Sequence, residues 1–322
     1  MRAMATDTAE RSVRQLRFEA GTAAEARVWQ AKARERLFEL LMGGGRPERV
    51  PIEATVLSRV EPEGASYRLE ELSLRSLADR TVHCWLAAPK EPVPSGGAAI
   101  LGLHGHGGTG EQMVRGEGLY WYGKMAAERG YCVIAPDIGS HELQHDNWTL
   151  MGERTWDALV ALEYLAQRPE VDAARIGTMG LSLGGEAVMY VAALDERLKV
   201  AVSSGWLTTV ANMKNGHCAC WDSPGLEEAF DFSDIFACVA PRRLVLEVGR
   251  QEAAPGGFPV EIAEQAFGEL KSAYGVFDCG GSVALDVHDG GHEFVGKVGW
   301  KALEERLPHP PTPSPAPASR AW

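Results

Sequence analysis

The chain has 322 residues and 45% hydrophobic content, enough for the core of one large α/β domain or two small ones. Its formal net charge of −12 argues against nucleic-acid and anionic-membrane partners, whose phosphates require a basic surface. No apolar run reaches the length of a membrane span, and residues 1–19 lack the apolar core of a signal peptide, so we expect a soluble cytoplasmic protein. Its six cysteines are expected to be reduced thiols.

The first part of the chain predicts a helix followed by antiparallel strands. Mixed apolar and charged residues predict a helix over 12–41, which ends at the glycines of 43–45. Strand-like runs separated by turn-forming residues follow at 53–60, 67–75 and 80–87. We therefore expect an N-terminal helical segment over residues 1–50, packed on a main domain over 51–307.

From residue 98 onward, predicted strands and helices alternate. The strands are expected at 98–103, 131–135, 175–179, 200–204, 243–248 and 283–287, and the helices at 118–128, 153–167, 185–194, 260–274 and 295–306. This alternation predicts an α/β fold: a mainly parallel central sheet with helices on both faces and an antiparallel N-terminal start. The long segment 205–236 is expected to form a cap or pocket wall. The proline-rich tail, 308–322, is expected to be disordered.

A G-x-S-x-G sequence, Gly180 to Gly184, joins the strand predicted at 175–179 to the following helix. In that setting the pattern predicts a sharp strand-to-helix turn that exposes the hydroxyl of Ser182 as a nucleophile. The alternative is a glycine-rich loop whose serine caps a helix. We interpret Glu186 as a structural carboxylate that meets the positive end of the helix dipole.

A serine nucleophile needs a base and an acid, which in this arrangement follow it along the chain. His292 lies in a Gly-Gly-His loop after the last predicted strand, and is preferred over the other histidines. Glu252 follows the strand predicted at 243–248, where its carboxylate would hold the neutral imidazole tautomer. A surface glutamate is the alternative reading of Glu252. The competing carboxylates are Asp222, Asp286 and Asp289.

An oxyanion hole requires two N–H donors, for which we predict the main chain of Leu183 and of His106. His106 lies in the glycine-rich loop 104–108, which follows a predicted strand. Besides these, the residues expected to bind substrate are Gly105, Gly107, Tyr120, Trp206 and His217. Core packing is the alternative for Tyr120.

Two groups of residues invite interpretation as a metal site. His217, Cys218 and Cys220 offer soft ligands, and the loop 104–108 offers two imidazoles. Neither group has a further partner at the spacing of a known zinc motif, so we expect no metal.

These motifs resemble those of the α/β-hydrolase superfamily, and within it the dienelactone-hydrolase-like and acetyl-xylan-esterase-like bacterial hydrolases. The resemblance covers residues 51–307. The stretches that carry it are His104-Gly105-His106-Gly107-Gly108, Ala135-Pro136-Asp137, Gly180-Leu181-Ser182-Leu183-Gly184-Gly185, Ala240-Pro241-Arg242 and Gly290-Gly291-His292. Such relatives usually carry Asp where this chain has Glu252.

The resemblance implies hydrolysis of a small-molecule carboxylic ester through an acyl-enzyme, by the triad Ser182, His292 and Glu252, without a cofactor. Esters of small or medium acyl groups, acetylated carbohydrates among them, are the candidate substrates. The alternatives are a peptidase related to prolyl oligopeptidases, whose usual extra domain has little room here, and a catalytically silent binding protein. Monomer and homodimer both stay open.

Overall fold

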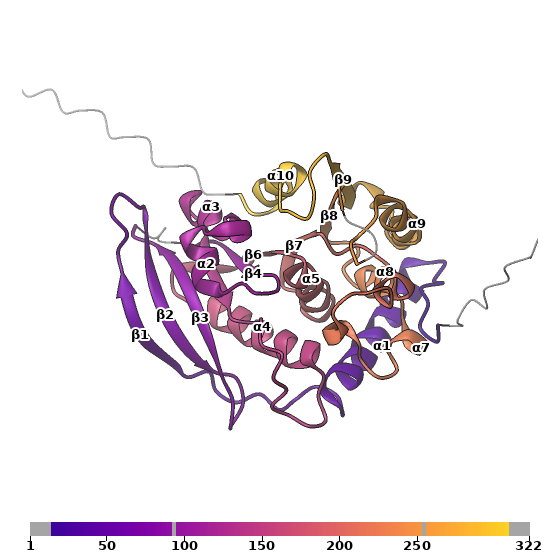
Figure 1. Ribbon diagram of the computed structural model, residues 1–322, viewed down its shortest axis with the longest axis horizontal. Coiled ribbons are helices and arrows are strands. Elements are labelled where there is room, and N and C mark those ends of the chain that lie inside the picture. Colours follow the sequence, from indigo (N-terminus) through magenta and orange to yellow (C-terminus); the bar gives the residue numbers. More distant parts are fainter. Residues whose placement is uncertain (1–13, 92–94, 253–255, 309–322) are drawn as a thin grey trace, which may run out of the picture.

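The computed structural model describes residues 14–91, 95–252 and 256–308, which form one sheet covered by helices (Figure 1). The strands are β1 (Ala54–Val60), β2 (Tyr67–Arg75), β3 (Thr81–Pro89), β4 (Gly97–Leu103), β5 (Cys132–Pro136), β6 (Val171–Leu181), β7 (Leu198–Ser204), β8 (Arg243–Gly249) and β9 (Val283–His288). Their order in the nine-stranded sheet is β1-β2-β3-β5-β4-β6-β7-β8-β9. The strand that precedes Ser182, β6, therefore lies in the interior of the sheet.

The sheet has an antiparallel part and a parallel part. Strands β1, β2, β3 and β5 pair antiparallel in that order. Every later pair, from β5–β4 to β8–β9, is parallel. Parallel strands end at the same edge, so the loops that follow β4, β6, β8 and β9 share that edge. The predicted α/β fold with an antiparallel start is confirmed.

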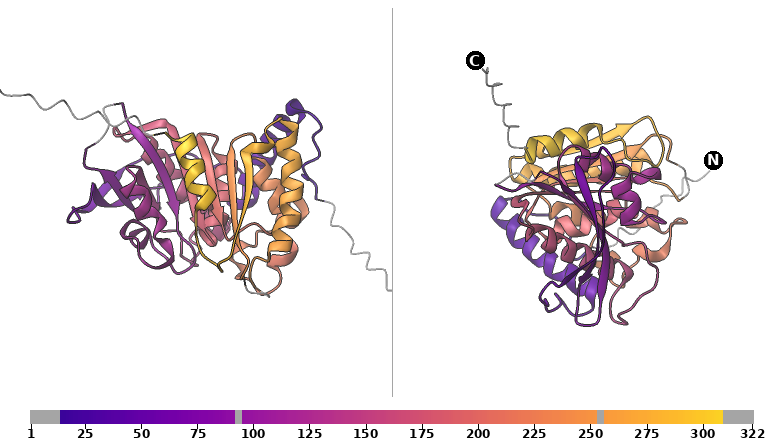
Figure 2. Two further views of the ribbon diagram at one scale, coloured as in Figure 1. Left: turned by 90° about the horizontal axis from the view of Figure 1, so that it is seen from above. Right: turned by 90° about the vertical axis from the view of Figure 1, so that its left-hand side faces the viewer.

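Helices cover both faces of the sheet, as Figure 2 shows. The helices are α1 (Ala23–Met42), α2 (Gly110–Arg115), η1 (Gly118–Tyr120), α3 (Tyr122–Glu128), α4 (Leu150–Ala166), α5 (Leu183–Leu194), α6 (Val210–Met213), η2 (Ala219–Trp221), α7 (Leu226–Ala229), α8 (Phe232–Ala237), α9 (Val260–Val276), η3 (Gly280–Ser282) and α10 (Lys297–Arg306). Residues of α1, α4, α5, α8 and α9 join one hydrophobic cluster. Residues of α2, α3 and α10 join a second cluster, on the opposite face.

Two helix predictions were wrong in their bounds. The helix expected over 12–41 begins only at Ala23, because Thr22 caps it: its side chain accepts from the Glu25 N–H, and the Glu25 carboxylate accepts from the Thr22 N–H. The helix expected over 118–128 is split into η1 and α3, and the short α2 before it was missed. A helix of only six residues, such as α2, has too little periodicity for its hydrophobic pattern to reveal it.

Helix α1 is held to the main domain by buried polar contacts. The Gln30 side chain donates to the carbonyls of Ala237 (3.0 Å) and Ala240 (2.7 Å). The Arg34 guanidinium donates to the carbonyl of Ala193 at 2.8 Å. These bonds satisfy carbonyls at the ends of α8 and α5 and so tie α1 to these two helices. The expectation of a disordered tail concerns residues that, beyond Pro308, lie outside the described part of the chain.

The segment between β7 and β8 folds into the short elements α6, η2, α7 and α8. These elements are three to six residues long, so the backbone of the segment changes direction every few residues. Over the described ranges, we find no helix with the length and apolar character needed to cross a membrane.

Candidate active site

Ser182 sits between β6 and α5 in a strained conformation. Its φ of 61° and ψ of −122° lie in a region that non-glycine residues rarely adopt. The glycines on either side allow the close approach that this turn needs. A Cβ atom on Gly184 would lie 2.0 Å from the carbonyl oxygen of Leu103, at the end of β4, and one on Gly180 would lie 2.3 Å from the oxygen of Gly184. The turn thus presents Ser182 at the edge where the parallel strands end.

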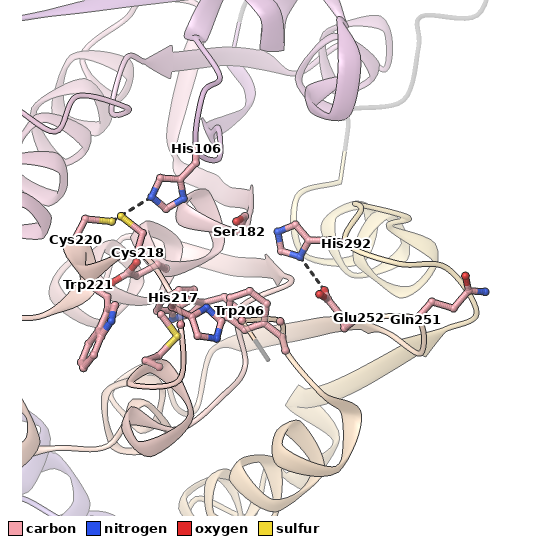
Figure 3. A pocket seen from close by; sticks show the side chains of 16 residues that line it. His106, Ser182, Trp206, His217, Cys218, Cys220, Trp221, Gln251, Glu252 and His292 are labelled. Atoms are coloured by element: carbon pink, nitrogen blue, oxygen red, sulfur yellow. Dashed lines mark hydrogen bonds and ion pairs between the residues drawn. The ribbon is translucent and has the colours of Figure 1, made fainter. Parts of the chain in front are cut away.

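The structure brings His292 and Glu252 together. The Nδ1 atom of His292 lies 2.8 Å from Oε1 of Glu252, whose side chain is only 4% exposed. In Figure 3 the other nitrogen of His292 faces Ser182, and both residues line the same pocket. Two of the three competing carboxylates have other partners. Asp289 pairs with Arg250 at 3.3 Å, and Asp286 accepts from the Val298 N–H at 3.1 Å.

Packing fixes the plane of the His292 ring. The ring of Phe258 stacks on it with centroids 5.5 Å apart and an interplanar angle of 13°. Gly205, at a φ of 59°, passes so close that a Cβ atom there would lie 2.8 Å from Cε1 of His292. These contacts leave the imidazole little freedom to turn away from the Glu252 carboxylate.

A second buried glutamate, Glu247 in β8, anchors the loop that carries His292. Its Oε1 accepts from the Ser204 hydroxyl and from the Val295 N–H, both at 2.8 Å, and its Oε2 accepts from the Gly296 N–H at 2.5 Å. Burial raises the pKa of Glu247, whereas these hydrogen bonds favour its charged form. The sequence analysis missed this residue. Its one signal was a carboxylate within the otherwise apolar run Leu244–Val248.

The side chains of His104 and Tyr120 fix the loop that follows β4 next to Ser182. His104 is fully buried: its Nδ1 lies 2.9 Å from the Gly105 carbonyl, and its Nε2 accepts from the Ile138 N–H at 3.0 Å. Burial lowers the pKa of His104, which keeps the ring neutral. The Tyr120 hydroxyl donates to the His106 carbonyl at 2.9 Å and so fixes that peptide.

Gly105 brings this loop against the turn at Ser182. A Cβ atom on Gly105 would lie 2.9 Å from the Leu181 oxygen and 3.2 Å from Cβ of Ser182. The structure thus places the two predicted oxyanion donors, His106 and Leu183, in the segments that flank Ser182. Leu183 is the first residue of α5, where N–H groups lack intrahelical acceptors.

A cavity of about 390 Å³ opens beside Ser182. Its lining residues are His106, Ser182, Glu186, Trp206, Met213, Gly216, His217, Cys218, Cys220, Trp221, Gln251, Glu252, Gly256, Gly257, Phe258 and His292. Of the further residues expected to bind substrate, Trp206 and His217 line the cavity. Gly105, Gly107 and Tyr120 instead belong to the loop after β4 and its support.

Two ionisable side chains of the cavity are held neutral at pH 7. Burial, with the nearby charge of Arg154, lowers the pKa of His106 to about 4. Burial raises the pKa of Glu186 to about 8, and its Oε1 has no hydrogen-bond partner among the described residues. Glu186 is therefore a protonated acid facing the cavity, not the charged helix-end carboxylate that the sequence suggested.

Comparisons with known proteins agree with this architecture. The profile of the prolyl oligopeptidase family matches residues 118–228. A protein of Bacillus subtilis (strain 168) named "Putative hydrolase YtaP" is 28% identical over 279 residues, which cover 78% of this chain and 90% of that protein.

Two solved structures superpose over most of the chain. One is described as a "putative acetyl xylan esterase" of Bacteroides fragilis NCTC 9343, with a TM-score of 0.69, 20% identity, and coverage of 86% of this chain and 79% of the other. The second is a glucuronoyl esterase from Solibacter usitatus, with a TM-score of 0.69, 15% identity, and coverage of 92% and 96%. The chain has the α/β-hydrolase fold. Within this fold, the turn at Ser182 joins the interior strand β6 to helix α5.

Proposed function

We propose that this α/β-hydrolase is a serine esterase. The observation that carries the proposal is the hydrogen-bonded pair of His292 and Glu252, facing a serine held at positive φ at the end of a central strand. Such a pair can accept the hydroxyl proton of Ser182 and stabilise the imidazolium that results. A buried, oriented carboxylate next to an imidazole has this use in nucleophilic catalysis.

The reaction follows from the arrangement of these groups. Ser182 Oγ attacks the ester carbonyl while Nε2 of His292 takes its proton, and the N–H groups of Leu183 and His106 bind the oxyanion. His292 then protonates the leaving alcohol, so the acyl group stays on Ser182. Water, deprotonated by the same imidazole, attacks the acyl-enzyme and releases the acid. Each oxyanion donor of this kind contributes about 3 kcal/mol to the stabilisation of the transition state.

For the substrate class, we propose esters of a small or medium acyl group, with acetylated carbohydrates as the leading candidates. The cavity supports this proposal, because it combines the aromatic side chains of Trp206, Trp221 and Phe258 with polar groups from His217 and Gln251. Aromatic faces and a few placed polar groups suit a sugar-sized ligand. The esterase names of the similar structures point the same way.

The test combines active-site labelling with a substrate panel. We expect a fluorophosphonate probe to label the wild-type protein at Ser182, and acetyl and butyryl esters to be hydrolysed, both in simple alcohols and on xylan fragments. The Ser182→Ala variant is the matched control and should show neither labelling nor turnover. A wild-type protein that resists the probe would instead be a silent binding protein, and the esterase proposal would fail.

A peptidase is the second candidate, and the match of residues 118–228 to the prolyl oligopeptidase family favours it. Acyl transfer from an amide uses the same groups, but His292 must then protonate an amine leaving group. A panel of proline-containing peptides beside the ester panel separates the two activities, because both enzymes would react with the fluorophosphonate.

We also propose a cytoplasmic location. The six cysteines are free thiols, four of them buried, which supports a reducing compartment.

A further inference from the structure

Four potential metal ligands meet at the rim of the cavity. They are His106 from the loop after β4, His141 from the loop after β5, and Cys218 and Cys220 from the segment between β7 and β8. Their ligand atoms all lie within 4.8 Å of one another. In Figure 3 the sulfur atoms of Cys218 and Cys220 lie next to each other and close to the ring of His106.

Two of the contacts within this cluster come close to the dimensions of a tetrahedral site. Nε2 of His106 lies 3.1 Å from Sγ of Cys220, and Nε2 of His141 lies 3.4 Å from Sγ of Cys218. The two imidazole rings stack with centroids 5.4 Å apart and an interplanar angle of 27°. Ordinary Zn–S and Zn–N bonds at tetrahedral angles place neighbouring ligand atoms roughly 3.3–3.8 Å apart. Small movements of these side chains would therefore complete the coordination.

Hydrophobic packing does not account for the gathering of these residues. His141 and Cys218 are exposed, His106 is exposed as a whole residue although its ring nitrogen meets Cys220 in a partly buried contact, and only Cys220 is buried. Both cysteines are free thiols, so no disulfide draws them together. Two thiols and two imidazoles from three separate loops form the Cys₂His₂ set that prefers Zn²⁺.

We propose that His106, His141, Cys218 and Cys220 bind one Zn²⁺ ion, which ties the pocket wall to the loops after β4 and β5. Binding releases the two thiol protons to solvent, and the two thiolates balance the charge of the ion. Four protein ligands leave no open position, so the ion has a structural and not a catalytic role. The site is separate from Ser182, His292 and Glu252, and it does not depend on the proposed esterase activity.

This proposal departs from the expectation drawn from the sequence. There, His217-Cys218-Ala219-Cys220 lacked a second ligand pair at zinc-motif spacing. The structure supplies that pair from His106 and His141, two residues in different loops. It leaves His217 outside the set, in contact with Phe258 at 5.0 Å between ring centroids.

The test is the metal content and metal spectroscopy of the full chain. We expect elemental analysis of the purified protein to give about one zinc per chain. Chelator-stripped protein should bind Co²⁺ with the intense visible absorption of a tetrahedral thiolate site. The double variant Cys218→Ser and Cys220→Ser and the single variant His141→Asn should lose this absorption, whereas Cys279→Ser, which changes a free thiol outside the cluster, should keep it.

Thermal unfolding gives a second readout, because a ligand that binds only the folded chain raises Tm with its concentration. Zn²⁺ should raise the Tm of stripped wild type and of Ser182→Ala, but not that of His141→Asn. Since Ser182→Ala tests the metal site without esterase activity, the two proposals can fail separately. The zinc proposal is overturned if wild type binds no Zn²⁺, if the double variant binds it equally well, or if mass spectrometry finds a Cys218–Cys220 disulfide in freshly purified protein.

Discussion

The sheet edge that carries the candidate triad and the segment that walls the pocket are built in different ways. Ser182, His292 and Glu252 each follow a strand of the parallel sheet, namely β6, β9 and β8. The pocket wall, residues 205–236, contains several short helical turns, and its residues Trp206, Met213 and Trp221 line the cavity. We infer that the sheet fixes the reaction geometry, while the wall selects the substrate. Changes at the edge should therefore affect every ester, and changes in the wall should affect which ester is preferred.

The largest effect is expected at the nucleophile. Ser182→Ala should lower kcat by ~10⁶ for all esters, because among the described residues Ser182 is the one hydroxyl that lines the cavity. Steady-state assays on three esters of different acyl length measure this loss. Equal retention of turnover on any of them would show that the candidate triad has been assigned wrongly.

The second-largest effect on kcat is expected at Glu252, the candidate acid of the triad. Glu252→Gln keeps the size of the side chain but removes the charge that stabilises the imidazolium, so kcat should fall by ~10⁴. Glu264→Gln, an exposed change in the nearby α9, is the matched control and should leave kcat unaltered. An equal, small effect of both substitutions would remove Glu252 from the triad.

Substitution of Gly205 tests how closely the backbone packs against the His292 ring. Gly205→Ala and Gly118→Ala both place a side chain at a φ near +60°, so each should cost about 1–2 kcal/mol of stability. Only at Gly205 does the new Cβ meet the His292 ring, whereas at Gly118 it meets open space. We expect kcat to drop ~10²-fold in Gly205→Ala and to stay the same in Gly118→Ala. Loss of activity in both variants would point to general unfolding.

Substitution of Met213 tests whether the pocket wall contacts the acyl group of the substrate. Its side chain is 3% exposed and lines the cavity, so Met213→Ala should make room for a longer acyl chain. The ratio of kcat/KM for hexanoyl over acetyl esters should rise roughly 10-fold. The rate of fluorophosphonate labelling at Ser182 should change little. An unchanged acyl preference would mean that the acyl group does not contact the wall.

The last prediction concerns stability and pH, and it is not expected to change the ester preference. Because burial raises the pKa of Glu186 to about 8, the folded chain holds this proton more firmly than the unfolded chain does. Stability should then fall as the pH rises from about 5 towards 8, by at most about 1.4 kcal/mol per pH unit. Urea unfolding of wild type and Glu186→Gln across this range measures the difference. Parallel stability curves would show that Glu186 titrates normally.

The sequence predicted the strands and the fold better than the helix ends. The run at 67–75 alternates apolar and polar residues, and β2 has the same bounds, Tyr67–Arg75. The start of α1 was misplaced because a local cap at Thr22 outweighs the helical pattern before it. The residues of the candidate triad could be named because each is tied to a strand end and a motif, although their roles stay predictions.

The cluster of His106, His141, Cys218 and Cys220 could not be predicted in the same way. Its members belong to loops whose approach depends on how the 205–236 segment folds over the sheet. The spacing of these four residues along the sequence gives no sign that their loops meet in the fold. The buried anchors of the loops, His104 and Glu247, were hidden for the same reason, since their partners lie at distant positions in the chain.

The backbone conformation of Ser182 lowers the stability of the folded protein. A serine held at a φ of 61° gives up roughly 1–3 kcal/mol relative to a relaxed residue. That amount is a sizeable part of the total stability of an ordinary domain. The tight seating of α5 against β4 and β7 offsets it, with every residue of Leu183–Ala193 buried. The buried helix α5 thus holds Ser182 in its strained conformation, and substitutions that loosen the packing of α5 should let this backbone relax.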